Sequence, residues 1–331
     1  MTDVGQIERN TQNRVVQLFQ HQLEYDYLGD WQDRVGNSNV EEKYLREFLE
    51  GKGYDTPIID KAIHEFTKAT GIQTEDLYDS NNAVYNMLRY GVDVKARVGE
   101  NKETIHLIDW HNAENNQFAI AEEVTVKGVH NKRPDVVLYV NGIAVGVIEL
   151  KRSKVSVSEG IRQNLDNQKD DFIKPFFNTM QLIMAGNDTS GLRYGTTKTP
   201  EKYYLRWKEE TDQEFDYVLD RHLVQLCEKG RLLEIMYNFI VFDGGTKIVC
   251  RPHQYFGVKA AQGNVLEKKD GIIWHTQGSG KSLTMVWLAQ WIRENVTDSR
   301  VVVITDRTEL DKQITRVFND AEEPMERASS G

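Results

Sequence analysis

The sequence of 331 residues has few cysteines and lacks long apolar runs. Its two cysteines, Cys227 and Cys250, are too few for a disulfide framework and lack metal-ligand spacing, which indicates a reducing compartment. No stretch approaches the roughly 18 uninterrupted apolar residues that a membrane span needs. The polar start MTDVGQIERN also lacks the apolar region of a signal peptide. We therefore expect a cytoplasmic protein with no membrane partner.

Positive charge is scarce as well. The 41 lysines and arginines are outnumbered by 51 aspartates and glutamates, so the formal net charge is −10. This balance argues against a protein that simply coats nucleic acid, although it leaves room for a local basic channel. Hydrophobic residues make up 39% of the chain and charged residues 28%, which is typical of a soluble globular protein with one large domain or two.

With six prolines and no low-complexity linker, the domain boundary is unmarked, and the change of hydrophobic pattern has to locate it. Apolar spacing predicts helices over 6–28, 40–50, 58–69 and 81–89. The first ninety residues are thus expected to be mostly helical. Short β-like runs follow, at ETIHLIDW, NQFAIAEEVTV, DVVLYV, IAVGVIEL, MQLIMAG and KYYLRW.

A different pattern starts near 245–255, where we place the boundary. Helical periodicity over 215–240 is followed by the strand-like KIVC. The chain then reads as a strand (GIIWH), a glycine loop, a helix over 281–294 and a strand (VVVIT). This order is typical of a parallel α/β unit.

Two neighbouring strands carry a candidate catalytic group. Asp135 opens an apolar strand over 136–140, and Asn141-Gly142 is a strong hairpin-turn signal. The second strand, over 143–150, ends in Glu149-Leu150-Lys151. The pattern therefore predicts a hairpin with acidic and basic side chains at its open end.

These residue types suit metal-dependent hydrolysis. The carboxylates of Asp135 and Glu149 can hold Mg²⁺ through oxygen ligands, with the Leu150 carbonyl beside them. The metal would polarise a scissile phosphate and supply a hydroxide-like nucleophile. Lys151 would orient water or stabilise developing charge. We therefore expect Asp135, Glu149 and Lys151 to be catalytic, with the two carboxylates as metal ligands.

Strand register decides whether these side chains meet. Glu149 and Lys151 are two residues apart and share a face. A regular two-residue hairpin makes Asp135 oppose Ile148 and turns it away from Glu149. A three-residue loop or a single bulge brings Asp135 onto the face of Glu149 and Lys151. We predict this second register, and a regular hairpin without a bulge would exclude the joint site.

An edge-strand ion pair is the alternative interpretation, because Glu-x-Lys is a common pattern. What distinguishes Glu149 and Lys151 is their place at the end of an apolar strand whose partner begins with an aspartate. Burying two carboxylates without a cation is costly, so the pair itself argues for a ligand. The other Glu-x-Lys cases look like solvated faces: Glu41/Lys43, Glu50/Lys52, Glu100/Lys102 and Glu267/Lys269.

The segment His275–Ser282, HTQGSGKS, follows a predicted strand and opens a predicted helix. It ends in the Gly-Lys-Ser of a phosphate-binding P-loop, although His275 stands where the general pattern has its first glycine. Backbone N–H groups would face phosphate oxygens, Lys281 would reach the β- and γ-phosphates, and Ser282 would bind Mg²⁺. The alternative is a turn into a helix with an incidental Gly-Ser-Gly. We expect the nucleotide to contact Thr276, Gly278, Ser279, Gly280, Lys281 and Ser282.

Another candidate for the nucleotide lies upstream of this loop. Arg251-Pro252-His253-Gln254 precedes a predicted helix, and Gln254 is hypothesised to read an adenine edge. The alternative is that Gln254 is simply a residue of the helix start.

Together these segments closely resemble the R (restriction, or motor) subunit of type I restriction-modification enzymes. The resemblance covers nearly the whole chain, through IERNTQNRVV, YDYLGDW, RPDVVLYVNGIAVGVIELK, NFIVFDGGTKIVCRPHQ, WHTQGSGKS and ITDRTELDKQI. The family joins an N-terminal PD-(D/E)xK nuclease to a superfamily 2 helicase-type motor. His275 is itself characteristic of this motor group, so the departure from the general P-loop pattern supports the resemblance.

The resemblance implies an α/β fold with two parts. Residues 1–245 would form an endonuclease domain whose core, about 95–190, is a restriction-endonuclease-like mixed sheet flanked by helices. Residues 246–331 would begin a RecA-like parallel α/β motor lobe that is incomplete. No later Asp-Glu-x-His segment follows, so we expect an N-terminal fragment with the nuclease and P-loop but not a complete motor.

The family adds further candidate site residues. Glu8, on the first predicted helix, matches an additional acidic position of such nucleases. Gln163 matches the glutamine of a Gln-x-x-x-Tyr pattern that follows the ExK strand, whereas Asn167 stands where the tyrosine would be. Gln163 is therefore expected to contact DNA or to support the site.

The function implied is an ATP-dependent endonuclease and DNA translocase that cuts unmodified double-stranded DNA with Mg²⁺. ATP is the second expected cofactor. The resemblance also implies methyltransferase (M) and specificity (S) subunits as partners, with DNA sequence recognition by S, and the absence of a recognition-helix or zinc-finger pattern fits this. Lys132, Arg133, Arg152 and Lys154 offer a local basic footprint for DNA phosphates.

Two other functions stay open at this point. One is an ATP-driven nucleic-acid motor whose N-terminal domain only docks partners, which does not require Asp135, Glu149 and Lys151 to converge. The other is a nuclease–helicase fusion in DNA repair or in another defence system.

Overall fold

A computed structural model describes residues 3–73, 76–95, 101–306, 308–321 and 326, with the backbone alone for 3–8. The chain divides into two compact units, Met1–Leu233 and Glu234–Gly331, and each is described by itself. None of the helices in these residues is long and apolar enough to cross a membrane.

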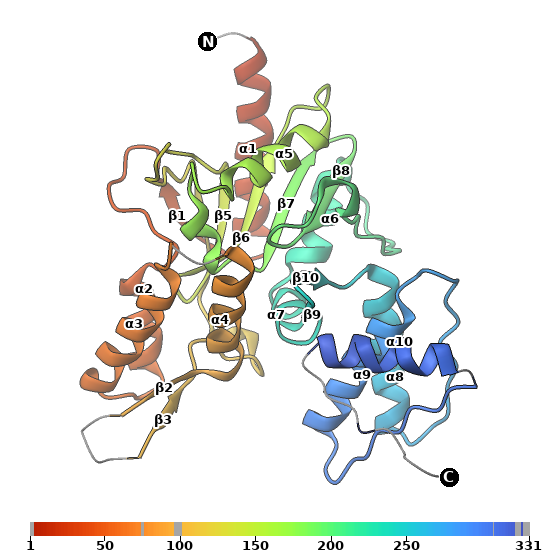
Figure 1. Cartoon of the computed structure of the whole chain (residues 1–331). Helices are drawn as coiled ribbons and strands as arrows, with labels where there is room; N and C mark the ends of the chain where they lie inside the picture. The colour runs from red at the N-terminus through yellow and green to blue at the C-terminus, as the bar shows by residue number, and fades with distance from the viewer. Residues whose placement is uncertain (1–2, 74–75, 96–100, 307, 322–325, 327–331) are drawn as a thin grey trace. The chain divides into compact units, whose positions relative to one another are not determined.

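The first unit is built on a six-stranded mixed sheet in the order β1-β4-β5-β6-β7-β8 (Figure 1). β1 runs parallel to β4 and β6 runs parallel to β7, whereas the other neighbours are antiparallel. The strands are β1 (Asp26–Asp30), β4 (Phe118–Glu122), β5 (Val136–Val140), β6 (Ile143–Leu150), β7 (Leu182–Asn187) and β8 (Gly191–Gly195). A mixed α/β fold with a sheet flanked by helices is confirmed.

Helices cover both faces of this sheet. α5 (Val157–Asn167) packs on β6 and β7, and α1 (Asp3–His21) and α6 (Val218–Cys227) pack on the other face (Figure 1). The remaining elements of this part are α2 (Glu42–Gly51), α3 (Thr56–Thr70), α4 (Leu77–Tyr90), the small hairpin of β2 (Val92–Val94) and β3 (Glu103–Ile105), and three short 3₁₀ turns η1 (Ala113–Asn115), η2 (Lys174–Asn178) and η3 (Glu201–Tyr203). The helix α7 (Lys229–Asn238) begins in this unit, and its residues from Glu234 on belong to the second unit.

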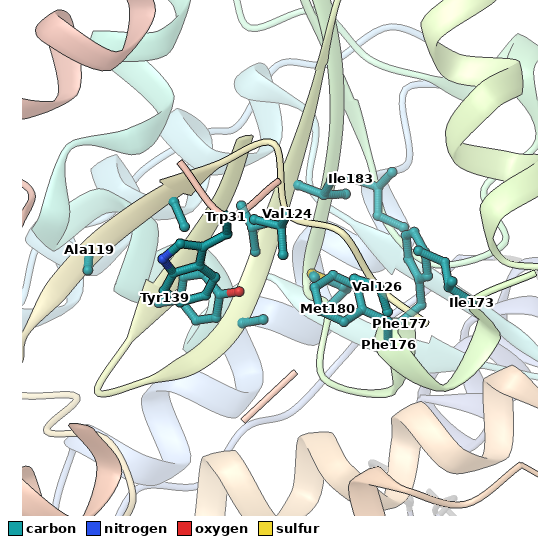
Figure 2. Packing of buried hydrophobic residues seen from close by; sticks show 14 of the residues in the cluster. Trp31, Ala119, Val124, Val126, Tyr139, Ile173, Phe176, Phe177, Met180 and Ile183 are labelled. Carbon is teal, nitrogen blue, oxygen red and sulfur yellow. The ribbon is translucent and has the colours of Figure 1, made fainter. Parts of the chain in front are cut away.

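A buried apolar cluster fixes the sheet on its α5 side. Val137, Tyr139 and Val147 from the central strands belong to one cluster with residues of η2 and α4. Figure 2 labels Tyr139 and the η2 residues Phe176 and Phe177 in this cluster. Trp31 packs on Tyr139, with 5.5 Å between ring centroids. Burying side chains of this size contributes on the order of 1.5–3 kcal/mol each. The central hairpin is therefore held rigidly, and so are the residues at its end.

Two elements of this unit differ from the sequence-based expectation. The first helix ends at His21 rather than extending to residue 28, because Glu24 has a φ of +57° and the chain turns there into β1. Tyr25 then packs between Phe19 and Phe118. The segment KYYLRW is not a strand either: η3 covers its start, and Leu205 makes a single bridge to Tyr194.

The second unit holds α8 (Pro252–Leu266), α9 (Lys281–Asn295), α10 (Thr308–Asp320) and a hairpin of β9 (Ile240–Asp243) and β10 (Thr246–Val249). The predicted strands GIIWH and VVVIT are not strands, which corrects that prediction. A parallel strand needs ladder partners beside it, and within the described residues of this unit the β9–β10 pair is the one ladder. Trp274 and Ile304 are accordingly 90% exposed.

Candidate active site

The hairpin of β5 and β6 contains the bulge that the joint site requires. Near the turn Tyr139 pairs with Ala144, but beyond it Leu138 pairs with Gly146, so Val145 is an extra residue in β6. Past the bulge the register continues through Val136 and Ile148, which sets Asp135 across from Glu149. The predicted register is confirmed, and it is produced by a bulge in β6 and not by a longer loop.

The three predicted side chains come together at the end of this hairpin. Asp135 Oδ2 accepts a hydrogen bond of 2.6 Å from the Leu150 N–H. Lys151 Nζ donates to Glu149 Oε1 over 2.7 Å. The side chains of Glu149 and Lys151 are 1% and 14% exposed, respectively. The arrangement is therefore a largely buried group of two carboxylates and one ammonium.

Burial controls the electrostatics of the two acids. It raises the pKa of Asp135 above its ordinary value, although the nearby Lys151 ammonium and the Leu150 N–H oppose the rise. Burial, and then the negative charge of Asp135, raise the pKa of Glu149 well above its ordinary range. Two carboxylates that repel each other in a dry environment bind a cation or a proton.

The residues present fit a divalent cation. Glu149 Oε2 is buried without a hydrogen-bond donor among the described residues, and the second carboxylate stands beside it. No group of three or more His, Cys, Asp or Glu side chains suited to a metal occurs in the described part of the chain. Mg²⁺ is commonly bound by one or two carboxylates while it keeps several waters. Asp135 and Glu149 can therefore supply the protein ligands of such a site.

An edge-strand ion pair does not describe this group. β6 is an interior strand between β5 and β7, and all eight of its residues are buried. By contrast, Glu267 and Lys269 form an ion pair of 2.5 Å on the surface, with side chains 60% and 67% exposed. The two Glu-x-Lys pairs thus differ in burial.

α5 packs directly against the site. Gly160 lies so close to β6 that a Cβ added to it would be 3.3 Å from Glu149 Cγ and 3.1 Å from the Ala185 Cβ. Gln163 is half-buried on the next turn of the same helix. Asn167, at the position of the family's tyrosine, is buried, and neither of its amide atoms has a hydrogen-bond partner among the described residues.

α1 reaches the same end of the sheet from the other face. Gln12 Nε2 donates to the buried Glu122 carboxylate over 2.9 Å and lies 3.4 Å from the Asp135 carbonyl oxygen. Tyr27 also donates to Glu122, over 2.6 Å. Glu8 lies in α1 one turn before Gln12, and its side chain is outside the described residues.

Gln12 and Glu122 were not found from the sequence. They are 110 residues apart, and each belongs to an ordinary helix or strand pattern. The one available signal was Glu122 itself, a charged residue at the end of the otherwise apolar strand β4.

The four basic residues near the hairpin have different environments. Arg133 forms an ion pair of 2.7 Å with Glu123. Lys132 lies over the ring of Phe172, with its Nζ 4.1 Å from the ring centroid. Arg152 is half-buried and Lys154 is exposed. These residues supply positive charge around the site, but Arg133 is already paired.

The loop before α9 lines a cavity of about 820 Å³ in the second unit. Gly278 and Gly280 both have a positive φ, of +76° and +84°. Gly280, Lys281 and Ser282 are among the residues that line the cavity. Lys281 Nζ donates to the carbonyls of His275 and Thr276, over 3.1 and 3.3 Å. The cavity is of the size that small ligands occupy.

Gln254 occupies the start of α8, as the helix-start interpretation requires. Its Oε1 accepts from the Arg251 N–H over 2.8 Å, and its Nε2 donates to the Gly280 carbonyl over 3.0 Å. It is 3% exposed and is not among the residues lining the cavity beside the loop. Reading of an adenine edge by Gln254 stays a prediction.

Comparison with known proteins defines first the class and then the family. The segment 253–331 matches the sequence model of the SWI2/SNF2 ATPases, so this part is similar to an ATPase. Residues 6–202, more than half of the chain, match the model described as "Type I restriction enzyme R protein N terminus". The chain belongs to this family.

Individual relatives agree with this assignment. The chain is 26% identical over 309 residues to a putative type I restriction enzyme MjaIXP endonuclease subunit of Methanocaldococcus jannaschii, covering 81% of the chain and 29% of the relative. It is 29% identical over 292 residues to the type I restriction enzyme HindI endonuclease subunit of Haemophilus influenzae, covering 80% and 27%. For the MjaVIIIP endonuclease subunit of M. jannaschii the identity is 32% over 289 residues, covering 81% and 26%. The chain thus spans less than a third of the length of these relatives.

Proposed function

We propose that the first unit is a Mg²⁺-dependent endonuclease that hydrolyses phosphodiester bonds of unmodified double-stranded DNA. The observation that carries the proposal is the convergence of Asp135, Glu149 and Lys151 at one end of the β5–β6 hairpin. Membership of the type I restriction R protein family supplies the substrate class. The names of the relatives describe them as endonuclease subunits.

The side chains have distinct roles in this proposal. Asp135 and Glu149 would hold the cation, and a bound Mg²⁺ polarises the phosphate and lowers the pKa of a coordinated water. Lys151, fixed by its contact with Glu149, is placed to stabilise negative charge that develops on a phosphate oxygen. The Leu150 N–H fixes the rotamer of Asp135. Gln163, and Glu8 from α1, are proposed to support this site.

For the whole protein we propose ATP-driven translocation of DNA coupled to cutting, in the cytoplasm, with M and S subunits as partners. The ATPase-like match and the glycine loop support an ATP site at Gly278, Ser279, Gly280, Lys281 and Ser282. The motor lobe that we place at 246–331 is proposed to be part of a RecA-like fold.

A motor with a non-catalytic docking domain explains less. Docking does not require two buried carboxylates to converge beside a lysine, whereas the proposed metal-dependent cleavage does. A nuclease–helicase fusion in repair or another defence system has the same site, so its partners distinguish it. Co-purification of the intact protein with M and S subunits supports restriction, and their absence supports the fusion.

Cleavage by the intact complex tests the nuclease. Unmodified circular DNA with Mg²⁺ and ATP is the substrate, and Asp135→Ala or Lys151→Ala should abolish cutting while ATP hydrolysis continues. Lys43→Ala is the matched control, because Lys43 also belongs to a Glu-x-Lys pattern but is 74% exposed. Unchanged cutting by the Asp135 and Lys151 variants would reject the proposed active site.

A further inference from the structure

Two arginines face each other at the β8 edge of the six-stranded sheet. Tyr194 in β8 and Leu205 exchange two backbone hydrogen bonds, of 3.0 and 2.8 Å, in an antiparallel bridge. The next opposed pair in this register is Arg193 and Arg206, so their side chains lie on the same face. Like charges directly opposite each other destabilise a sheet. Stability alone therefore does not account for this pair.

α6 brings two further side chains to the same edge (Figure 1). His222 Nδ1 accepts a hydrogen bond of 3.0 Å from the Leu192 N–H, so the proton of the neutral ring is on Nε2. Burial lowers the pKa of this ring to about 4, helped by the charges of Arg206, Arg221 and Arg193. An uncharged ring thus lies among three guanidinium groups. We call Arg193, Arg206 and Arg221 the arginine cluster.

The arginine cluster carries three positive charges that no carboxylate neutralises. None of its members forms an ion pair in the described part of the chain, although the formal net charge of the sequence is −10. Two acids close to this edge in the sequence, Asp188 before β8 and Asp220 in α6, both pair with Arg14 instead. Arg221 Nε is buried without a hydrogen-bond partner among the described residues. All three side chains are only half-buried, so an anion can reach them.

Arg193 lies on the sheet face that carries the proposed active site. Glu149 pairs with Ala185 of β7, and Ala185 pairs with Arg193, so these three side chains share a face. It is the α5 face, because Gly160 of α5 approaches both Glu149 Cγ and the Ala185 Cβ. Two strand spacings, about 10 Å, separate Arg193 from Glu149. Arg193 Nη1 also donates to the Ser190 carbonyl over 3.3 Å, at the sheet end where the active site lies.

We propose that the arginine cluster binds the phosphodiester backbone of duplex DNA beside the phosphate that is cut. The proposal rests on the proposed nuclease function and deepens it, because it directs the DNA from Glu149 across β7 to the β8 edge. A separation of about 10 Å corresponds to roughly three steps of one strand at 3.4 Å each, so one strand can occupy both places. Guanidinium groups suit this task, since they present planar forks of donors to phosphate oxygens.

The salt dependence of DNA binding tests the proposal. The 331-residue chain is titrated into fluorescent duplexes of two unrelated sequences in EDTA, between about 50 and 200 mM salt. Arg206→Gln removes one phosphate contact, so we expect weaker binding to both sequences and a slope of log affinity against log salt that is smaller by about 1. The Arg193→Gln, Arg206→Gln double variant should lose about 2. Arg206→Lys keeps the charge and should keep most of the slope.

Thermal unfolding without DNA separates a DNA contact from a structural role. Arg206→Gln relieves the repulsion with Arg193, so its melting temperature should equal or exceed that of the wild type. A lower melting temperature together with weaker DNA binding would give Arg206 a structural role and overturn the inference. Arg46→Gln is the matched control, because Arg46 of the same unit is 34% exposed and pairs with Asp60 over 2.7 Å. This control should leave the salt slope unchanged.

The remaining outcomes are also decisive. Unchanged affinity and slope in the Arg193 and Arg206 variants would overturn the inference, as would a wild-type chain that binds no DNA at about 50 mM salt. Inorganic phosphate is the second probe. If the substitutions weakened stabilisation by phosphate but left DNA binding unchanged, the arginine cluster would be a site for a free anion and the inference would fail. Cutting by Asp135→Ala in the intact complex would instead reject the proposed nuclease site, whereas the salt slope decides whether the arginine cluster binds DNA.

Discussion

Asp135 and Glu149 face each other across the antiparallel strands β5 and β6 because the single extra residue Val145 shifts the register of these strands by one. Without the bulge Asp135 would oppose Ile148 and point to the other side of the sheet. The bulge therefore creates the acidic pair, and the sheet core on either side keeps it in place. Several measurable properties depend on this pair.

Thermal stability should depend on pH through the two carboxylates. Burial raises the pKa of Asp135 to about 6 and that of Glu149 well above its ordinary range. The folded protein therefore holds these protons more tightly than the unfolded chain. The resulting stabilisation is fully present below the unfolded pKa values and is lost as pH rises through the folded ones. We expect the metal-free protein to lose stability as pH rises from about 4 through about 6, the raised pKa of Asp135, and then through the raised pKa of Glu149.

Asp135→Asn isolates this effect. The variant keeps a side-chain oxygen for the Leu150 N–H but removes one charge, so we expect its free energy of unfolding at about pH 8 to exceed that of the wild type by on the order of 1–3 kcal/mol. Calorimetric unfolding in EDTA over this pH range measures the difference, which should shrink as pH falls. Mg²⁺ should raise the melting temperature of the wild type more than that of the variant. An equal response of both proteins to Mg²⁺ would contradict a metal site at this carboxylate.

The close contact of α5 with β6 predicts a second effect. Gly160→Leu places a side chain where a Cβ alone would already lie 3.3 Å from Glu149 Cγ and 3.1 Å from the Ala185 Cβ, closer than ordinary van der Waals contact. We expect a loss of about 1–3 kcal/mol in stability from overpacking, together with a strong reduction in DNA cleavage as Glu149 is displaced. Glu159→Leu, at an exposed position of the same helix, is the control. Full cleavage by Gly160→Leu would show that α5 does not position Glu149.

A third effect concerns the network behind Asp135. Glu122 is 5% exposed and receives hydrogen bonds from Gln12, Tyr27 and Arg9, so removal of Gln12 or Tyr27 takes one hydrogen bond away from a buried carboxylate. We expect Gln12→Leu and Tyr27→Phe each to lower the free energy of unfolding by roughly 1–3 kcal/mol. Denaturant unfolding measures this. Because Gln12 also contacts the Asp135 carbonyl, its variant should lose more cleavage than the Tyr27 variant, and the reverse order would argue against a link through Asp135.

The sequence predicted those elements whose structure depends on residues close together in the chain. The hairpin over 136–150, the helices α2 to α4 and the need for a register shift follow from turn chemistry and the two-residue period of strands. The location of the bulge at Val145 does not, because a valine in a buried strand carries no signal of its own.

Long-range pairing explains the remaining differences. β1 forms because Asp26–Asp30 finds a parallel partner in β4, far along the chain, and not because its own pattern favours a strand. The apolar run VVVIT has the strand pattern but no ladder partner among the described residues, so it does not form one. The Gln12–Glu122 contact likewise depends on how α1 packs on the sheet. Local patterns thus predicted the hairpin of β5 and β6, and tertiary contacts supplied its surroundings.

A fourth prediction compares the two left-handed glycines of the loop before α9. Gly278 and Gly280 share a positive φ, so alanine at either position is strained by about 1–2 kcal/mol. A Cβ on Gly278 meets nothing within 4 Å, whereas one on Gly280 meets Gln254 Nε2. Gly280→Ala should therefore lower the stability of the second unit further than Gly278→Ala, as measured by thermal unfolding. The excess should fall in the Gly280→Ala, Gln254→Ala double variant, because the clashing amide is gone and the two substitutions are coupled. Strictly additive effects would show that Gln254 does not press on the loop at Gly280.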